Sequence, residues 1–481
     1  MTNEDHSRCL EAFIVALDQA CGGGQKRWYA STLELQLASL EICRACRSIP
    51  TLAVRVDDQT PRSLWLPPTS KTEPDARSSK KVRISSRVPI VRALRLTWGL
   101  PTEVLVQRAA VELWRWSKFL RLMGFVSAYT IRSASWPTGL KELVLEAPLD
   151  VLVAAAVWPP SLEHLKFGYH FYQPIAGAVW PTSLQQLSFE HFNQPIAGVA
   201  WPASLQQLSF GAQFDMPISE VVWPAFLREL SFGFCFNQPI AGVAWPASLQ
   251  QLSFGRQFNQ PIAGVAWPAS LQQLSFGRQF NQPIARVVWP ASLQQLWLGS
   301  AFNQPIAEVV WSSSSLQQLS FGAFFNQPIS GVVWPASLHA LAFGHNFDQA
   351  IDGAVWPVSL RQLSFGHAFR QPIAGVVWPV SLQLLSFGYC FNHPIDAAVW
   401  PVSLQQLSFG GYFNQPIAGV VWPASLQHVS FGDDFNQPIA EVVWPASLQH
   451  LSFGQGFNHP TAGLVWPASL QRVTKPGISI I

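Results

Sequence analysis

Apolar residues recur along most of the chain at fixed places of a 22-residue period. Residues 245 to 266 read WPASLQQLSFGRQFNQPIAGVA, and we number the places from 1 at the tryptophan to 22. Places 1, 5, 8, 10, 14, 18 and 21 are apolar. Leu252 and Phe254 alternate with Gln251 and Ser253, which is typical of a short, half-buried strand. The pattern predicts one strand in every period.

The period is kept over sixteen copies, from Trp136 to Trp466. Successive tryptophans lie 22 residues apart, except for one interval of 21 near Glu190 and one of 23 at the serines 312–315. Self-similarity at such a period predicts a solenoid in which stacked coils share one core.

The rest of each period cannot be helical, because Pro261 and Pro268 leave only six residues between them. We expect an extended or 3₁₀ return path, with a second short strand at the Val and Ala before each tryptophan. From Trp136 through the copy that begins at Trp444, no charged residue falls on an apolar place. Since an unpaired buried charge is costly, these places predict a dry interior.

Composition narrows the class of protein. Only 12% of the 481 residues are charged, and no window of 18 uncharged apolar residues is present, so no membrane-spanning helix is expected. The first residues are too acidic for a secretory signal, and six cysteines are too few to cross-link the chain. We therefore expect reduced thiols and a cytoplasmic protein, with a nuclear location as the alternative. Residues 1–135 hold 20 Lys and Arg against 12 Asp and Glu, whereas residues 136–481 hold 10 against 15, so nucleic acid is not an expected partner of the repeats.

The repeated phrase resembles the FNIP repeat of the leucine-rich-repeat-like superfamily, as at Pro246–Gly255 with Phe258–Ile262. The resemblance implies a mainly β, right-handed parallel solenoid of 22-residue coils, and repeats that act as protein-interaction surfaces. The chain departs from the family in using Trp where Leu commonly precedes Pro. Asn259 lies two places later than the usual leucine-rich-repeat asparagine. A buried asparagine ladder and a partly exposed row of asparagines both remain open.

The pattern predicts five segments. Residues 1–56 form a small helical N-terminal region, 57–82 a linker, 83–135 an N-terminal cap or degenerate repeats, 136–473 the solenoid and 474–481 a C-terminal tail. Within the third segment, the spacing of apolar residues predicts an amphipathic helix over residues 101–123 that caps the first coil. Residues 100–135 also begin like an F-box.

Candidate metal ligands are few. Cys43 and Cys46 have the spacing of a zinc pair, although buried free cysteines are the commoner alternative. Stacking of equal places predicts two ladders, His345, His367 and Tyr389 at place 12 and His428, His450 and Arg472 at place 7. No nucleophile, base and orienting acid recur together, so we expect no enzyme, no bound metal and no cofactor.

The leading hypothesis is a non-enzymatic protein-interaction scaffold that uses the solenoid face and the variable places 12 and 13, here called the rim. The alternatives are a passive rod and a ubiquitin-ligase substrate adaptor. We expect a monomer, because Lys475 and Pro476 discourage strand pairing at the C-terminal edge. The candidate partner-binding residues are Tyr169, His170, Phe234, Arg256, Gln257, Arg278, Gln279, His345, Asn346, His367, Tyr389, Asp433 and Asp434.

Overall fold

The computed structural model describes residues 94–97, 119–123, 136, 139–145, 153–311, 315–475 and 478–479. The chain divides into two units, Met1–Met216 and Pro217–Ile481. The predicted helical region 1–56 and linker 57–82, with Cys43 and Cys46, lie outside the described residues. No helix among the described residues is long and apolar enough to cross a membrane.

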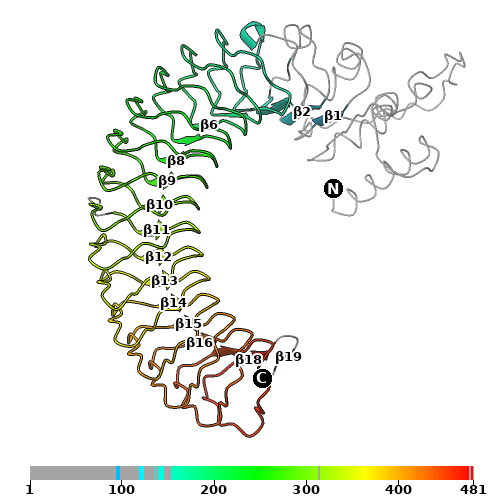
Figure 1. Cartoon of the computed structure of the whole chain (residues 1–481). Coiled ribbons are helices and arrows are strands. Elements are labelled where there is room, and N and C mark those ends of the chain that lie inside the picture. The colour runs from blue at the N-terminus through cyan, green and yellow to red at the C-terminus, as the bar shows by residue number, and fades with distance from the viewer. Residues whose placement is uncertain are drawn as a thin grey trace, which may run out of the picture. The chain divides into compact units, whose positions relative to one another are not determined.

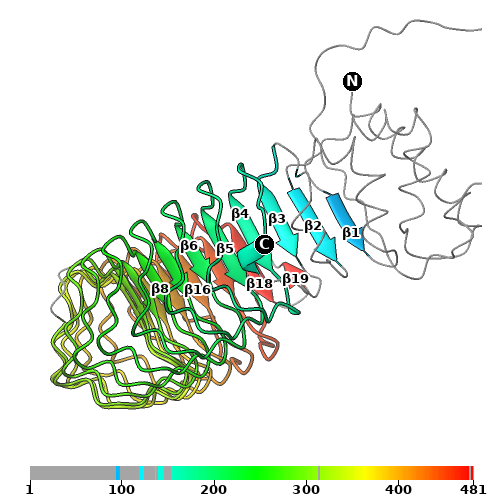
Figure 2. The same cartoon turned by 90° about the horizontal axis from the view of Figure 1, so that it is seen from above.

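The described residues of unit 1 form six strands, which run parallel to one another and lie side by side (Figure 2). They are β1 (Leu94–Thr97), β2 (Phe119–Met123), β3 (Glu142–Leu145), β4 (His164–Phe167), β5 (Gln186–Phe189) and β6 (Gln207–Ser209), with one 3₁₀ turn, η3 (Val153–Ala155). Leu120 of β2 pairs with Leu94 of β1 and with Leu143 of β3. The helix predicted over 101–123 is therefore wrong at Phe119–Met123. There Leu120 and Leu122 flank Arg121 with the period of two that a strand requires.

Unit 2 continues the same architecture with one three-residue strand in nearly every coil, and its strands lie one beside the next (Figure 1). Its strands are β7 (Glu229–Ser231), β8 (Gln251–Ser253), β9 (Gln273–Ser275), β10 (Gln295–Trp297), β11 (Gln318–Ser320), β12 (Ala340–Ala342), β13 (Gln362–Ser364), β14 (Leu384–Ser386), β15 (Gln406–Ser408), β16 (His428–Ser430), β17 (His450–Ser452), β18 (Arg472–Lys475) and β19 (Ile478–Ser479). Pairing from β7 to β18 is parallel and in register, so that equal places meet, as Leu252 meets Leu274. The predicted parallel solenoid of 22-residue coils is confirmed.

The coil of residues 245–266 turns at three corners, places 3–4, 12–13 and 19–20, and most of the described coils do the same. The second strand expected before each tryptophan does not form in the described coils. The backbone of this segment forms hydrogen bonds within its own turn instead. The N–H of Val265 at place 21 donates to the carbonyl of Ile262 at 3.3 Å. A group engaged within its own turn cannot join a ladder between coils.

The interior is a set of stacked apolar columns. Phe258 is fully buried, and its ring lies 4.1 Å from the ring of Phe254 in the same coil and 6.2 Å from Phe280 in the next. Tryptophan rings form a further column. The ring of Trp378 lies 6.4 Å from that of Trp356 in the preceding coil and 6.4 Å from that of Phe387 in its own coil. Such contacts add to the burial of apolar area, so each coil is stabilised mainly by its neighbours.

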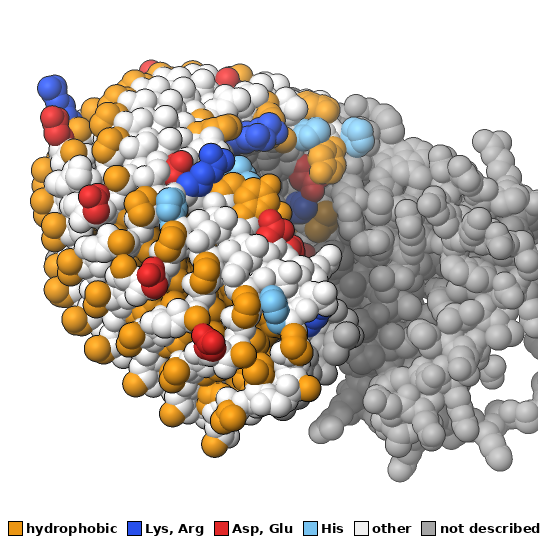
Figure 3. All heavy atoms as spheres, turned by 60° about the horizontal axis from the view of Figure 1, so that its bottom comes forward, with side chains coloured by type: hydrophobic (Ala, Val, Ile, Leu, Met, Phe, Trp, Pro, Cys, Tyr) orange, Lys and Arg blue, Asp and Glu red, His pale blue; other side chains and the backbone are white. Residues whose placement is uncertain are grey.

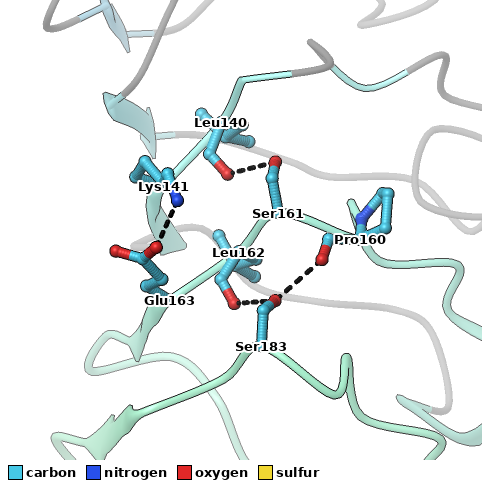
Figure 4. Close-up of polar contacts among 7 residues, drawn as sticks. All are labelled: Leu140, Lys141, Pro160, Ser161, Leu162, Glu163 and Ser183. Carbon is cyan, nitrogen blue, oxygen red and sulfur yellow. Dashed lines mark hydrogen bonds and ion pairs between the residues drawn. The ribbon is translucent and has the colours of Figure 1, made fainter.

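Serine side chains at place 4 bind the backbone of the preceding coil. Ser248 Oγ donates to the carbonyl of Leu227 at 2.6 Å. Figure 4 shows the start of this ladder in unit 1, where Ser161 donates to the carbonyl of Leu140 and Ser183 to that of Leu162. The ladder satisfies carbonyl groups just before each strand, where no strand partner is present.

Asparagine side chains at place 15 form a second ladder. Asn259 Oδ1 accepts hydrogen bonds from the backbone N–H of Asn281 at 2.9 Å and from Gln282 Nε2 at 3.1 Å. The asparagines of this part of the ladder are half-buried. The two alternatives left open by the sequence thus combine, because a ladder forms and one side of it meets solvent.

Glycine is required at place 11 by close packing. A Cβ added to Gly255 would lie 1.6 Å from the carbonyl oxygen of Gly233 in the preceding coil. At place 20 the reason differs, since Gly264 has a φ of +78°, which disfavours other residues.

The chain itself pairs with part of the C-terminal edge. β19 pairs antiparallel with β18, with Ser479 opposite Thr474 and Ile478 opposite Lys475. A second chain therefore cannot pair with these two residues of β18, and the expected monomer stays a prediction.

Candidate functional site

The outward face of the strands carries places 7 and 9, which are mostly glutamine and serine. In β8, Gln251 is exposed and Ser253 is half-buried on either side of the buried Leu252. The face is nearly uniform over β8, β9 and β11, and it changes at Trp297 of β10 and at Leu384 of β14. A uniform amide and hydroxyl surface offers hydrogen bonds but little to tell one partner from another.

A hollow of about 1000 Å³ lies on this face, over β14 to β18. It is lined by His428, His450, Arg472 and Lys475, and by the hydroxyl groups at place 9 of successive coils. The rings of His428 and His450 stack with centroids 4.6 Å apart and 3° between planes, so the predicted ladder at place 7 forms at these two residues.

Burial, and in second place the neighbouring His450, lower the pKa of His428 below its ordinary value of 6.5. The ring is therefore neutral at pH 7 and accepts a proton reluctantly. Arg472 and Lys475 bring two basic side chains to the same hollow.

All thirteen candidate residues of the sequence analysis lie at the rim. Every one at place 12 is exposed, and those at place 13 are exposed or half-buried. The structure brings some of them together. Phe234 lies under the Arg256 guanidinium at 5.1 Å, and Tyr169 meets the ring of His191 edge-on at 4.5 Å in unit 1.

Four rings in successive coils contact one another in a row, here called the aromatic row: His345, His367, Tyr389 and Tyr412. Centroids are 4.4 Å apart from His345 to His367 and 4.8 Å from His367 to Tyr389, with 6° between planes in both cases. Tyr412 follows at 4.6 Å, tilted by 59°. The predicted ladder at place 12 is confirmed and is longer than expected.

The extension to Tyr412 depends on a glycine. Gly411 occupies place 12 of that coil, and a Cβ there would lie 2.2 Å from the ring of Tyr389. The ring of Tyr389 therefore lies over Gly411, and the stack passes to Tyr412 at place 13. The sequence signal was the pair Gly411-Tyr412, where other coils carry a side chain at place 12.

Polar groups surround the aromatic row. His345 Nδ1 lies 2.8 Å from Asn346 Oδ1, and the Cys390 thiol lies 3.7 Å from His367 Nδ1. Partial desolvation raises the pKa of Tyr389, and the nearby Tyr412, Asp434 and Asp433 raise it further. The phenol thus stays protonated at neutral pH and is available as a hydrogen-bond donor.

The structure offers no evident metal centre within the residues it describes. His345 with His367 and His428 with His450 remain pairs, and no group of three or more His, Cys, Asp and Glu side chains gathers there.

These features define a leucine-rich-repeat-like solenoid. The chain superposes on CroV588, a circular leucine-rich-repeat protein, with 35% sequence identity and a TM-score of 0.64. The match covers 80% of this chain and 63% of CroV588, so the chain spans less than two thirds of that protein. The chain in the Toll–Spatzle complex of Drosophila is 12% identical, with 80% of this chain and 64% of that chain covered and a TM-score of 0.46. An internalin of Listeria monocytogenes is 15% identical, with 61% and 80% covered and a TM-score of 0.41.

The particular repeat is the FNIP repeat. Its family model matches residues 157–191, 192–235, 236–279, 258–301, 391–434 and 413–456. The chain therefore carries FNIP repeats in a leucine-rich-repeat-like solenoid. Comparison with curated proteins gave no match.

Proposed function

We propose that the chain is a non-enzymatic scaffold that captures a protein partner on the rim of its solenoid. The fold supports this proposal, because a stack of coils with a constant interior can vary its surface coil by coil. The variation is concentrated at places 12 and 13, whereas places 7 and 9 repeat glutamine and serine. The observation that carries the proposal is the aromatic row.

The aromatic row has the properties of a binding hot spot. Tyrosine is enriched at the energetic centres of interfaces, and it offers a large apolar face together with a hydroxyl donor. Tyr389 is 39% exposed and Tyr412 is 48% exposed. Because each ring already contacts the next ring of the row, a partner would have little side-chain motion to arrest on binding.

Comparative capture from cell extract tests the proposal. The full chain is compared with the quadruple variant His345→Ala, His367→Ala, Tyr389→Ala and Tyr412→Ala, after cross-linking and mass spectrometry. A matched control carries Gln251→Ala and Gln273→Ala on the strand face. We expect one protein to be enriched by the unaltered chain and by the control, and to be lost from the quadruple variant.

Two results would count against the scaffold. If all three chains enrich the same proteins, the aromatic row is not the contact surface. If none enriches any protein reproducibly, the passive rod is the better account. The adaptor hypothesis receives no support from the fold, since Phe119–Met123 within residues 100–135 belongs to strand β2.

A further inference from the structure

A stripe of exposed valines runs along unit 2, about half a repeat away in sequence from the aromatic row. Nine consecutive coils carry valine at place 22, and three of them are joined by valine at place 3 of the following coil. Their side chains are between 67% and 94% exposed. The stripe consists of Val288, Val310, Val333, Val355, Val358, Val377, Val380, Val399, Val402, Val421, Val443 and Val465.

The fold does not require valine at these places. Two other coils of unit 2 carry Ala244 and Ala266 at place 22, and Ala269 represents the usual residue of place 3. All three alanines are exposed, as the valines are. The valines therefore add apolar surface without adding to the core, and exposed apolar patches of this extent mark interaction sites.

The stripe is symmetric about its middle. Val377 is the fifth of the nine valines at place 22, and Val380 is the second of the three at place 3. No charged residue occupies place 22 or place 3 along the stripe. Figure 3 shows many hydrophobic side chains on the face that it draws, with fewer charged side chains among them. A patch that matches itself when reversed end to end is what a two-fold interface requires.

We propose that the valine stripe is the interface between two copies of this chain, related by a two-fold axis through Val377–Val380. Valine at place 22 of one copy then meets valine at place 22 of the other, coil by coil. A fully buried valine corresponds to roughly 60–120 Å², so the exposed parts of twelve valines provide on the order of 800 Å² per copy. Stable interfaces bury about 800 Å² per partner. The expectation of a monomer considered only the C-terminal edge, and the stripe lies elsewhere.

The same symmetry brings like charges together at the border of the interface. Asp352 and Asp396 lie one coil before and one coil after the middle, and Glu308 and Glu441 lie three coils before and after it. All four are exposed at the corner of places 19 and 20, and the two-fold axis sets each carboxylate against its counterpart on the other copy. Added salt should therefore strengthen the dimer, since screening weakens this repulsion and leaves apolar contact intact.

Sedimentation velocity of the full chain over a range of concentrations tests the proposal. The variant replaces Val355, Val358, Val377, Val380, Val399 and Val402 by alanine, the residue that other coils carry at those places. We expect dimers of the unaltered chain and a dissociation constant raised at least about 100-fold in the variant, with an unchanged circular dichroism spectrum. The quadruple variant of the aromatic row is the matched control and should dimerise normally.

A second variant tests the two-fold arrangement itself. Asp352→Asn with Asp396→Asn should lower the dissociation constant several-fold at low salt and lose that advantage at high salt. A monomeric unaltered chain at every concentration would overturn the proposal. So would a dimer that survives the six alanines, or one that weakens as salt is added.

Discussion

The asparagine ladder of unit 2 has one natural break, and its repair should stabilise the coils on either side. Arg370 occupies place 15 between Asp348 and Asn392. Its own backbone N–H donates to Asp348 Oδ1 at 2.8 Å, so the ladder reaches this coil. An arginine side chain has no acceptor, however, and therefore cannot continue the ladder to Asn392. Arg370→Asn supplies the missing acceptor.

The expected gain follows from the intact rungs. In those rungs one asparagine oxygen accepts the next backbone N–H at 2.9 Å, as Asn392 Oδ1 does from Asn414. The net worth of such a hydrogen bond is about 0.5–1.5 kcal/mol, so we expect a local gain of about 1 kcal/mol. Asn259→Ala is the matched variant, which breaks an intact rung of the ladder. It removes the acceptor of Asn281 N–H and of Gln282 Nε2, and should cost about 1–3 kcal/mol.

Hydrogen–deuterium exchange is the appropriate assay, because long repeat arrays need not unfold as one cooperative unit. A gain of about 1 kcal/mol slows exchange about fivefold in the peptide that contains Asn392. The peptide that contains Asn281 should exchange at its usual rate in Arg370→Asn and faster in Asn259→Ala. Unchanged or faster exchange at Asn392 after the repair would refute the view that the ladder carries stability between coils.

Three further outcomes are expected. Gly277→Ala should cost about 3 kcal/mol or more in thermal unfolding, because its Cβ would lie 1.7 Å from the Gly255 carbonyl oxygen; an unchanged melting temperature would contradict the close packing. Trp378→Ala should cost about 3–5 kcal/mol of stability. Trp378→Phe should cost much less, because the indole N–H that it removes is buried without a hydrogen-bond partner among the described residues. Equal losses would show that the N–H is bonded. The pKa of His428 is lowered in the folded state, so the unfolded chain binds more protons below pH 6.5, and stability falls as the pH falls through that range. His428→Gln should reduce the loss of stability between about pH 7.5 and 5.5. An equal loss of stability in both proteins would contradict this reasoning.

The period and its apolar places predicted most of the fold. A charge on an inward place is so costly that its absence from the fifteen copies between Trp136 and the copy that begins at Trp444 indicated which side chains face the core, and parallel stacking then set equal places beside each other. The stacked rings of His345 and His367 followed from that register alone. The helix expected over 101–123 is wrong at Phe119–Met123 because the helical spacing that reaches Leu120 ends in a stretch where Leu120 and Leu122 alternate with Arg121 at the period of a strand.

Features that depend on three-dimensional approach escaped the sequence analysis. Tyr412 joins the aromatic row only because Gly411 leaves room for the ring of Tyr389. The valine stripe could not be predicted because a valine before each tryptophan is also typical of an inward strand residue. The turn from Ile262 to Val265, and the same turn in other coils, directs the residue at place 22 outward. Neither the close approach nor the turn has a signature in hydrophobic periodicity.

The most direct test of the scaffold places a photo-crosslinking amino acid, p-benzoylphenylalanine, at a single position of the full chain in cells. The account predicts that Tyr389 replaced in this way forms an adduct with one protein other than this chain, whereas Gln251 on the uniform strand face forms no specific adduct. Identical adducts from both positions, or no adduct from Tyr389 in any condition, would contradict the claim that the rim is where this solenoid holds its partner.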